Sequence, residues 1–515
     1  MKEYNFIPVL LGSDRNVYGM AVSFHEQYNV RSIALGKCDF LETRYTKIID
    51  LYQNKDIEKK EVFLEELKKI YENNKDKKLL LIACSDTYMK LIVENKKELE
   101  KYFLVPYIDE ELMNKLVLKE EFYKTCSKYN LDYPKTKIIN KENISIDFNY
   151  PVIIKPSDSV SYFKTDFSGK KKVFIVYNED EYNNTINNIY NSSYKGNLIV
   201  QEYIEGDDTT LRVMNCYVNK RHHVTFMALG NILLEEKTPK SIGDYDAIIP
   251  TYDEELFKKM KDFLESINYV GYANFDFKLD KKTNTYKLFE INIRQGRSSS
   301  FTTVAGCNLT KYVVDDFIYD KDMETEYLKN DYLWTIVPKG VIFKYLKNEK
   351  LKELVKKLYQ EKKVRNILFY KKDFSFKRYY FLTLRTLNYY NKYRKYYVVN
   401  SNKDDSNDSN NSNDKKSLGI IGNDYNKTTK LFNDIVMNTK AKTDQEHIII
   451  NIVLTKDIEK ENILKNIKYL ESIKTSYLII DIDDESIKDF IKENTNLIII
   501  DSLDKVQELH EENIL

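Results

Sequence analysis

The sequence predicts a multidomain protein of mixed class, with α/β units at both ends of the chain and an α+β region between them. At 515 residues the chain exceeds what one ordinary hydrophobic core supports. Apolar strands alternate with helices in residues 1–112 and 417–515, which indicates parallel sheets with crossover helices. In residues 113–325 two neighbouring strands are joined by a short polar turn, which favours antiparallel pairing.

Composition and charge exclude several classes of protein. Hydrophobic residues make up 42% and charged residues 31% of the chain, which is the balance of a globular protein. The 81 Lys and Arg residues nearly cancel the 80 Asp and Glu residues, so a nucleic-acid partner is not expected. The sequence shows no signal-peptide pattern and no apolar run that could span a bilayer. Five cysteines without CxxC spacing agree with a reducing compartment, and a cytoplasmic location is predicted.

The first region, residues 1–112, places two polar loops beside one sheet edge. Strands are expected at 6–11, 31–35 and 79–84, and helices from about residue 18 and residue 87. Ligands of such sheets bind beyond the carboxyl ends of the strands. Residues 12–19 and 85–88 are therefore expected to border a crevice.

Two lysines in residues 113–325 are candidate phosphate contacts. Lys119 lies on a predicted helix, and Lys155 ends an apolar strand at 151–156. An ammonium group is a compact charge that suits polyphosphate oxygens. Either lysine alone is more simply explained as a solvated surface group, but the apolar strand before Lys155 and the proline after it set this lysine apart.

A predicted hairpin supplies candidate metal ligands. Strand alternation places Asp276 on one face of the strand 272–279, and it places Glu290, Asn292 and Arg294 on one face of the run 288–294. If the strands pair, three oxygen ligands and a guanidinium converge, and hard oxygen ligands beside phosphate select Mg²⁺. The alternative is the polar outer face of an ordinary hairpin. The residues expected to pack behind this face are Phe275, Phe277, Phe289, Ile291 and Ile293.

With these residues the chain resembles the ATP-grasp fold over about residues 4–400. The resemblance is carried by Lys119, Lys155, the run QEYIEG at 201–206, Asp276 and the run EINIR at 290–294. A closer resemblance, to bacterial D-aspartate ligases, comes from PVLLGSD at 8–14, YGMA at 18–21 and KPSDSV at 155–160. It implies a Rossmann-like pre-ATP-grasp domain at 1–112, an ATP-grasp domain at 113–325 and a basic, aromatic extension at 326–400.

The resemblance also implies a role for each matching position. ATP phosphates would be bound by Lys119, Lys155 and the loop serines Ser157 and Ser159. The adenine would lie against Glu202, Tyr203 and Ile204, and the ribose against Glu205 or Asp207. Two Mg²⁺ ions would bind Asp276, Glu290 and Asn292, with Arg294 facing the transferred phosphoryl group. One departure is that Gly169 is the only glycine between residues 157 and 172, in a loop that is often glycine-rich in this fold.

The implied reaction joins a small amino acid, D-aspartate, to an amine. A carboxylate is a poor acyl donor until phosphorylation gives it a good leaving group, and this step needs positioning and charge neutralisation rather than a nucleophile. The implied acceptor is the lysine side chain of a nucleotide- or lipid-linked muramoyl peptide. Arg212 could clamp the amino acid's carboxylate, and a structural salt bridge explains it equally well. The alternatives are another acid or amine, or a non-catalytic nucleotide- or nucleic-acid-binding protein.

The remaining segments carry weaker signals. Basic and aromatic residues interleave at 371–397, which suits a solvated face over a small aromatic core, a stacked nucleic acid or the diphosphate of the acceptor. Residues 401–416 are too polar to fold and predict a linker. Residues 417–515 resemble the start of aspartate racemase, but no cysteine follows Cys307 to act as its acid or base. This unit is therefore expected to be degenerate and to serve in docking or homodimer formation.

Overall fold

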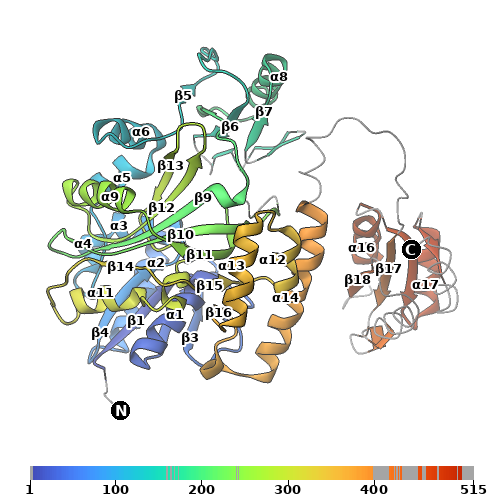
Figure 1. Ribbon diagram of the computed structural model, residues 1–515. Coiled ribbons are helices and arrows are strands. Elements are labelled where there is room, and N and C mark those ends of the chain that lie inside the picture. The colour runs from blue at the N-terminus through green and yellow to red at the C-terminus, as the bar shows by residue number, and fades with distance from the viewer. Residues whose placement is uncertain are drawn as a thin grey trace. The chain divides into compact units, whose positions relative to one another are not determined.

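The computed structural model divides the chain into two compact units, residues 1–404 and 405–515 (Figure 1). It describes residues 4–157, 161–162, 165–167, 169–171, 173–238, 241, 243–397, 417–422, 424, 427–428, 430–431, 450–454, 460–472, 475–495 and 497–500. The predicted linker at 401–416 lies outside the described residues.

A parallel four-stranded sheet opens the first unit, as the sequence predicts. Its order is β3-β2-β1-β4, and the strands are β1 (Phe6–Leu11), β2 (Ser32–Gly36), β3 (Ile49–Gln53) and β4 (Lys78–Ala83). Its helices are α1 (Arg15–Tyr28), α2 (Lys60–Glu72), α3 (Asp86–Glu94) and α4 (Lys96–Leu99). After β1 the chain turns at Gly12, whose φ of 123° suits glycine alone. Asp14 then caps α1 by accepting hydrogen bonds from the backbone of Asn16 and Val17.

Helices α5 (Glu110–Val117) and α6 (Lys119–Lys128) lead from this sheet to a small antiparallel one. The small sheet has the order β5-β8-β6-β7, with α8 (Glu179–Tyr190) beside it. The strands are β5 (Thr136–Ile139), β6 (Val152–Pro156), β7 (Phe174–Val176) and β8 (Leu198–Glu202). Lys155 lies on β6 and pairs in register with Ile199 of β8.

The largest sheet follows, in the order β13-β12-β9-β10-β11-β15-β16, with β14 paired to β10. Its short strands are β14 (Glu326–Tyr327), β15 (Leu333–Thr335) and β16 (Val364–Arg365). Its longer strands are β9 (Leu211–Val218), β10 (Val224–Glu235), β11 (Tyr245–Thr251), β12 (Gly271–Asp280) and β13 (Thr285–Asn292). The short turn η1 (Asp208–Thr210) precedes β9. One face packs on α9 (Glu254–Ser266) through Phe275 and Phe263, and the other face contacts α10 (Ser300–Val304). Helix α11 (Leu309–Phe317) follows α10. These strands and sheets form the expected ATP-grasp core.

The segment 326–397 is built into the first unit. The strands β14, β15 and β16 extend the large sheet, and Trp334 of β15 donates a hydrogen bond of 2.9 Å to Ser300 Oγ. The helices are α12 (Lys339–Tyr345), α13 (Glu349–Gln360) and α14 (Phe376–Tyr397), preceded by η2 (Lys371–Asp373). This segment therefore adds strands to the core as well as a helical layer.

A buried polar network ties this segment to the first sheet's neighbourhood. Arg378 Nε and Asp373 Oδ2 lie 3.4 Å apart, and both side chains are fully buried. The Asp373 carboxylate also accepts hydrogen bonds from the hydroxyls of Tyr18 (2.9 Å) and Thr46 (2.7 Å) and from the Lys47 backbone (2.6 Å). Residues that are more than 320 positions apart in sequence thus share one carboxylate.

The second unit contains the small α/β domain expected at the C-terminus. Its parallel sheet has the order β18-β17-β19-β20, with strands β17 (Ser417–Gly422), β18 (Ile450–Leu454), β19 (Thr475–Asp481) and β20 (Ile498–Ile499). Helices α16 (Lys460–Ser472) and α17 (Glu485–Glu493) contribute Ile463 and Ile491 to its core. Much of the stretch that resembles aspartate racemase, residues 432–449, lies outside the described residues.

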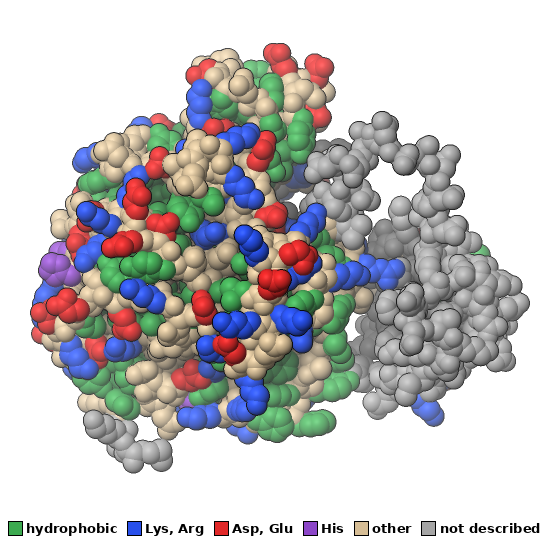
Figure 2. All heavy atoms as spheres, in the orientation of Figure 1, with side chains coloured by type: hydrophobic (Ala, Val, Ile, Leu, Met, Phe, Trp, Pro, Cys, Tyr) green, Lys and Arg blue, Asp and Glu red, His purple; other side chains and the backbone are tan. Residues whose placement is uncertain are grey.

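The surface agrees with the balanced composition. Figure 2 shows basic and acidic side chains interspersed over the face of the first unit in view. No helix within the described ranges is long and apolar enough to cross a bilayer.

Candidate functional site

The hairpin of β12 and β13 brings the predicted metal ligands to one face. Asp276 lies opposite Glu290, and Asn274 lies opposite Asn292. A β-bulge after Asp276 shifts the register, so that Leu288 lies opposite Phe277. Leu288 is therefore buried at 1% exposure, and the half-buried Phe289 does not pack behind the face as predicted. The other four residues of that predicted apolar backing, Phe275, Phe277, Ile291 and Ile293, are buried.

Hydrogen bonds hold the Asp276 carboxylate in place. Tyr245 donates its hydroxyl to Asp276 Oδ1 at 2.8 Å, and Asn292 Nδ2 donates to Asp276 Oδ2 at 3.2 Å. Burial, and then the facing Glu290 carboxylate, raise the pKa of Asp276 above its usual range, against the opposing effects of Tyr245 and Arg294. A divalent cation would relieve the repulsion between the two carboxylates, and the amide oxygen of Asn292 could serve as a further ligand.

The candidate metal cluster is small. Within the described ranges, no three His, Cys, Asp or Glu side chains gather in a way that could hold a metal ion. The cluster Asp276, Glu290 and Asn292 contains only two such side chains, and its third oxygen donor is an amide. Oxygen donors of this kind suit Mg²⁺, which keeps some of its waters and also binds substrate phosphates.

Lys119 is brought to the metal cluster. It begins α6, and its Nζ lies 3.6 Å from Glu290 Oε2. The Lys119 side chain is one-quarter exposed, so its ammonium remains open to a ligand. Lys155 is half-buried on the small sheet, where β6 also pairs Val152 with Glu202. The two lysines therefore come from different elements, α6 and β6.

Arg294 joins the hairpin to the first sheet. Its Nε and Nη2 donate to the two carboxylate oxygens of Asp86 at 2.7 and 2.8 Å, and Nη1 donates to the Gln295 carbonyl at 3.1 Å. Asp86 is the first residue of α3. The carboxylates of Asp86, Glu290 and Asp276 together raise the pKa of Arg294 despite its burial. The guanidinium thus lies within electrostatic reach of both candidate metal ligands.

Arg212 lies on the other face of the large sheet. It stands opposite Phe277 and Asn231 in register, whereas Asp276 stands opposite Val213. Its Nη1 donates to Asn231 Oδ1 at 2.6 Å and to two backbone carbonyls. The structure therefore does not bring Arg212 to the metal cluster, and its hydrogen bonds are structural. No described carboxylate lies within 4.0 Å of an Arg212 nitrogen, so the structural salt bridge considered from the sequence is not found there, and the carboxylate clamp stays a prediction.

The predicted adenine and ribose residues lie at and after the end of β8. Glu202 accepts a hydrogen bond from the Lys135 backbone at 2.8 Å, and Ile204 is buried. Glu205 pairs with Lys282 at 3.1 Å, and Asp207 caps η1 by accepting from Thr209. The Tyr203 ring lies 5.5 Å from Lys278 Nζ.

The candidate phosphate contacts also include two loop serines and a lysine on β12. Ser157 donates its hydroxyl to the Asn197 carbonyl at 2.8 Å, and Ser159 lies outside the described residues. Lys278 is a candidate that the sequence did not single out for phosphate binding. It is two residues after Asp276 on β12, and burial lowers its pKa. Its position on the Asp276 face was the available signal.

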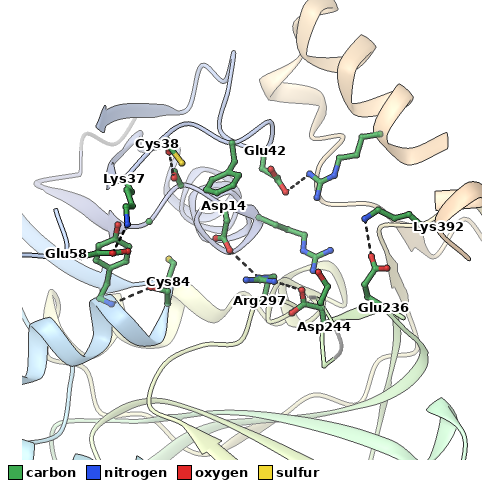
Figure 3. Close-up of a pocket in the computed structure, with 18 of the residues that line it drawn as sticks. Asp14, Lys37, Cys38, Glu42, Glu58, Cys84, Glu236, Asp244, Arg297 and Lys392 are labelled. Atoms are coloured by element: carbon green, nitrogen blue, oxygen red, sulfur yellow. Dashed lines mark hydrogen bonds and ion pairs between the residues drawn. The ribbon is translucent and has the colours of Figure 1, made fainter. Parts of the chain in front are cut away.

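A cavity of about 430 Å³ opens at the carboxyl ends of β1 and β4, where the sequence predicts a crevice (Figure 3). Residues 12–15 line it from the first loop, and Cys84, Ser85 and Tyr88 line it from the second. Arg297 lines it from the turn between β13 and α10. Helix α14 contributes a wall that the sequence did not predict, with Arg385, Tyr389 and Lys392.

Several known proteins are similar to parts of this chain. The model of the carbamoyl-phosphate synthase L chain, ATP-binding domain, matches residues 119–314. A D-alanine–D-alanine ligase from Wolbachia pipientis wMel is 26% identical over 201 residues, which are 36% of this chain and 56% of that protein. A biotin carboxylase complex with β,γ-ATP from Campylobacter jejuni is 13% identical with a TM-score of 0.48, over 63% of this chain and 74% of that one.

The fold and the matched ATP-binding domain define an ATP-grasp enzyme. A D-aspartate ligase from Enterococcus faecium is 42% identical over 399 residues, which are 75% of this chain and 95% of that protein. The chain belongs to the D-aspartate ligase family.

Proposed function

We propose that this protein is an ATP- and Mg²⁺-dependent ligase that activates D-aspartate as an acyl phosphate and joins it to an amine. The observation that carries the proposal is the shared face of Asp276, Glu290 and Asn292, with Lys119 3.6 Å from Glu290. Membership of the D-aspartate ligase family supports the choice of acid. The runner-up keeps this chemistry with another carboxylate or another amine.

Each side chain of the cluster has a role in the proposed mechanism. Lys119 and Lys155 neutralise ATP phosphates, and Arg294 faces the transferred phosphoryl group from its place beside Asp86. Asp276, Glu290 and Asn292 would hold two Mg²⁺ ions, which supply charge neutralisation at the phosphate oxygens when bound. Tyr245 fixes the orientation of the Asp276 carboxylate through its 2.8 Å hydrogen bond.

The nucleotide base is assigned to the end of β8. In the proposal, Glu202, Tyr203 and Ile204 bind the adenine, with Glu205 or Asp207 at the ribose. Ser157 and Ser159 remain proposed phosphate contacts. For Glu202 and Glu205, binding would require exchange of hydrogen bonds, because Glu202 accepts from the Lys135 backbone and Glu205 pairs with Lys282. Ile204 is buried and supplies apolar contact without such an exchange.

The reaction proceeds in two displacements. A carboxylate oxygen of the amino acid attacks the γ-phosphorus of ATP, and the bond from that phosphorus to the β-γ bridging oxygen breaks to release ADP. The neutral amine then attacks the acyl carbon, and the C–O bond to phosphate breaks. The amine nitrogen loses a proton, and the products are an amide and inorganic phosphate. The cluster contributes positioning and electrostatic stabilisation, and no side chain becomes covalently modified.

The proposed acceptor is the lysine side chain of a muramoyl peptide, linked to a nucleotide or lipid diphosphate. The basic, aromatic residues on η2 and α14 are the proposed approach for that diphosphate, because lysines and arginines favour phosphate. We also propose that residues 417–515 serve in docking or homodimer formation. No cysteine follows Cys307, so the two-thiol chemistry of the racemases that this unit resembles has no reagent here.

Phosphate release tests the proposal directly. The purified chain is incubated with ATP and MgCl₂ and a panel of D- and L-amino acids, with and without a muramoyl peptide that carries a free lysine side-chain amine. Release that requires D-aspartate and rises with the peptide is expected, together with a product heavier by one aspartyl residue. Release with a different acid alone would favour the runner-up, and no acid-dependent release would refute the proposed function.

A further inference from the structure

The charged side chains that line the cavity at the ends of β1 and β4 pair with one another, with one exception. All five carboxylates have a lysine or arginine nitrogen within 4.0 Å. The pairs are Asp14 and Asp244 with Arg297, Glu42 with Arg385, Glu236 with Lys392, and Glu58 with Lys37. Arg15 is the remaining cation of the lining, and no carboxylate in the described part of the chain lies within that distance of it.

Arg15 is also buried. It is the first residue of α1, its exposure is 6%, and its Nε has no hydrogen-bond partner among the described residues. Burial disfavours the charge of this guanidinium, but groups beyond ion-pair distance outweigh that effect and raise the pKa of Arg15, namely Tyr389, Asp244, Asp246 and Glu42. An anion in the cavity would add the direct contact that Nε lacks. The backbone amides at the start of α1 are already capped by Asp14, so the anion would be drawn to the side chain.

The cavity adjoins the reacting cluster through residues 294–297. Arg294 binds Asp86, which directly follows the lining residue Ser85. At the other end of this stretch, Arg297 lies 3.2 Å from Asp14, which directly precedes Arg15. Burial and the Asp14 carboxylate raise the pKa of the Cys84 thiol and the Arg294 guanidinium lowers it, so both charged groups lie within electrostatic reach of this lining residue. A small ligand in the cavity could therefore present one end to Arg15 and the other toward Arg294.

The amino acid substrate of the proposed reaction has two carboxylates, of which one is phosphorylated. We propose that Arg15 binds the other carboxylate, and that it thereby selects a dicarboxylic amino acid. A guanidinium matches a carboxylate bidentately, and the mutual pairing of the other charges leaves this one position for an anion. Tyr389 and Arg385 of α14 line the same cavity as Arg15. The inference rests on the proposed function, since it assigns one end of that reaction's substrate.

The test separates charge recognition from catalysis. Phosphate release is measured with D-aspartate and with D-asparagine, whose side-chain amide removes the charge at nearly constant shape, at saturating ATP. A charge-assisted hydrogen bond is worth about ten- to hundredfold in affinity. Arg15→Gln is expected to lose at least that factor in kcat/KM for D-aspartate, mainly through KM, and little for D-asparagine, with KM for ATP unchanged. Arg15→Lys should retain part of the preference, and the exposed Arg31→Gln should behave as wild type.

Equilibrium binding keeps the test independent of turnover. D-aspartate is titrated calorimetrically into the wild type and the variant with a non-hydrolysable ATP analogue and MgCl₂ present. Binding at least about tenfold weaker in Arg15→Gln supports the assignment. Equal binding in both proteins, or an equal loss for both amino acids, overturns it even if the ligase reaction is established. If Arg15→Gln does not fold by circular dichroism, Arg15→Lys carries the same comparison, and an unchanged ratio of the two acids refutes the inference.

Discussion

Replacing Glu290 with glutamine should separate catalysis from stability. The substitution removes one of two carboxylates that face each other on β12 and β13 while keeping the shape of the side chain. Loss of one electrostatic contact to a reacting centre costs about 100- to 1,000-fold in kcat. Phosphate release with D-aspartate is therefore expected to fall by at least about 100-fold.

The stability of the same variant can be worked out from the hairpin. Side chains directly opposite in a sheet are about 5 Å apart, and two unit charges at that distance repel by about 3 kcal/mol at an effective dielectric constant of about 20. The Glu290 side chain is 48% exposed, so screening reduces this repulsion to about 1 kcal/mol or less. Loss of the exposed contact with Lys119 opposes a gain of that size. The free energy of unfolding should thus stay within about 1 kcal/mol of wild type.

The two readouts are urea unfolding and steady-state phosphate release. Glu98→Gln, on the surface helix α4, is the matched control, because it removes an exposed carboxylate whose ion pair is with Lys101. Near-normal turnover in Glu290→Gln would refute the metal assignment. A parallel loss of activity and several kcal/mol of stability would show instead that Glu290 holds the hairpin together.

Three further outcomes are expected. Lys119→Met should raise KM for ATP by about tenfold or more in steady-state assays, because a phosphate contact is lost. Lys128→Met, at the other end of α6, should leave KM for ATP unchanged. Equal KM values for the two variants would contradict the assignment. Burial raises the pKa of Asp246 to about 7 in the folded chain, whereas this group ionises at about pH 4 in the unfolded chain. The free energy of unfolding therefore falls as pH rises from about 4 to about 7. Asp246→Asn should therefore unfold at higher urea than wild type at pH 8 and show no such gain near pH 4, and a gain independent of pH would contradict this reasoning. Arg378→Met leaves Asp373 buried without its cation and should destabilise the first unit by about 3–5 kcal/mol in urea unfolding, a prediction that a change below about 1 kcal/mol would refute.

The shared face of the candidate metal ligands could be predicted because its pattern is local. Alternation along two strands joined by a short turn is enough to place Asp276, Glu290 and Asn292 on one face. The bulge after Asp276 could not be foreseen, since it depends on the register between the strands. It exchanged Phe289 for Leu288 in the core without moving the cluster itself.

The features that the sequence does not predict depend on contacts between residues that are distant in sequence. Arg212 was placed on the correct strand, but its face is set by pairing with β10 and β12, which a single segment does not reveal. The wall of α14 over the cavity brings residues near 385 beside residues 12–15, and no spacing rule connects them. The parallel sheet of residues 1–112 was predicted from strand–helix alternation, yet the short strand β3 has a mostly exposed pattern and gave no apolar signal.

The buried Asp373 carboxylate has a consequence for dissecting the molecule. Asp373 lies on η2, shortly before α14, and its carboxylate accepts hydrogen bonds from Tyr18, Thr46 and Lys47. The helical tail is therefore a structural part of the N-terminal half. A fragment trimmed to the matched stretch 119–314 would lose both the sheet edge at Trp334 and this anchor. Cutting the gene near codon 404 is the dissection most compatible with an intact ligase half.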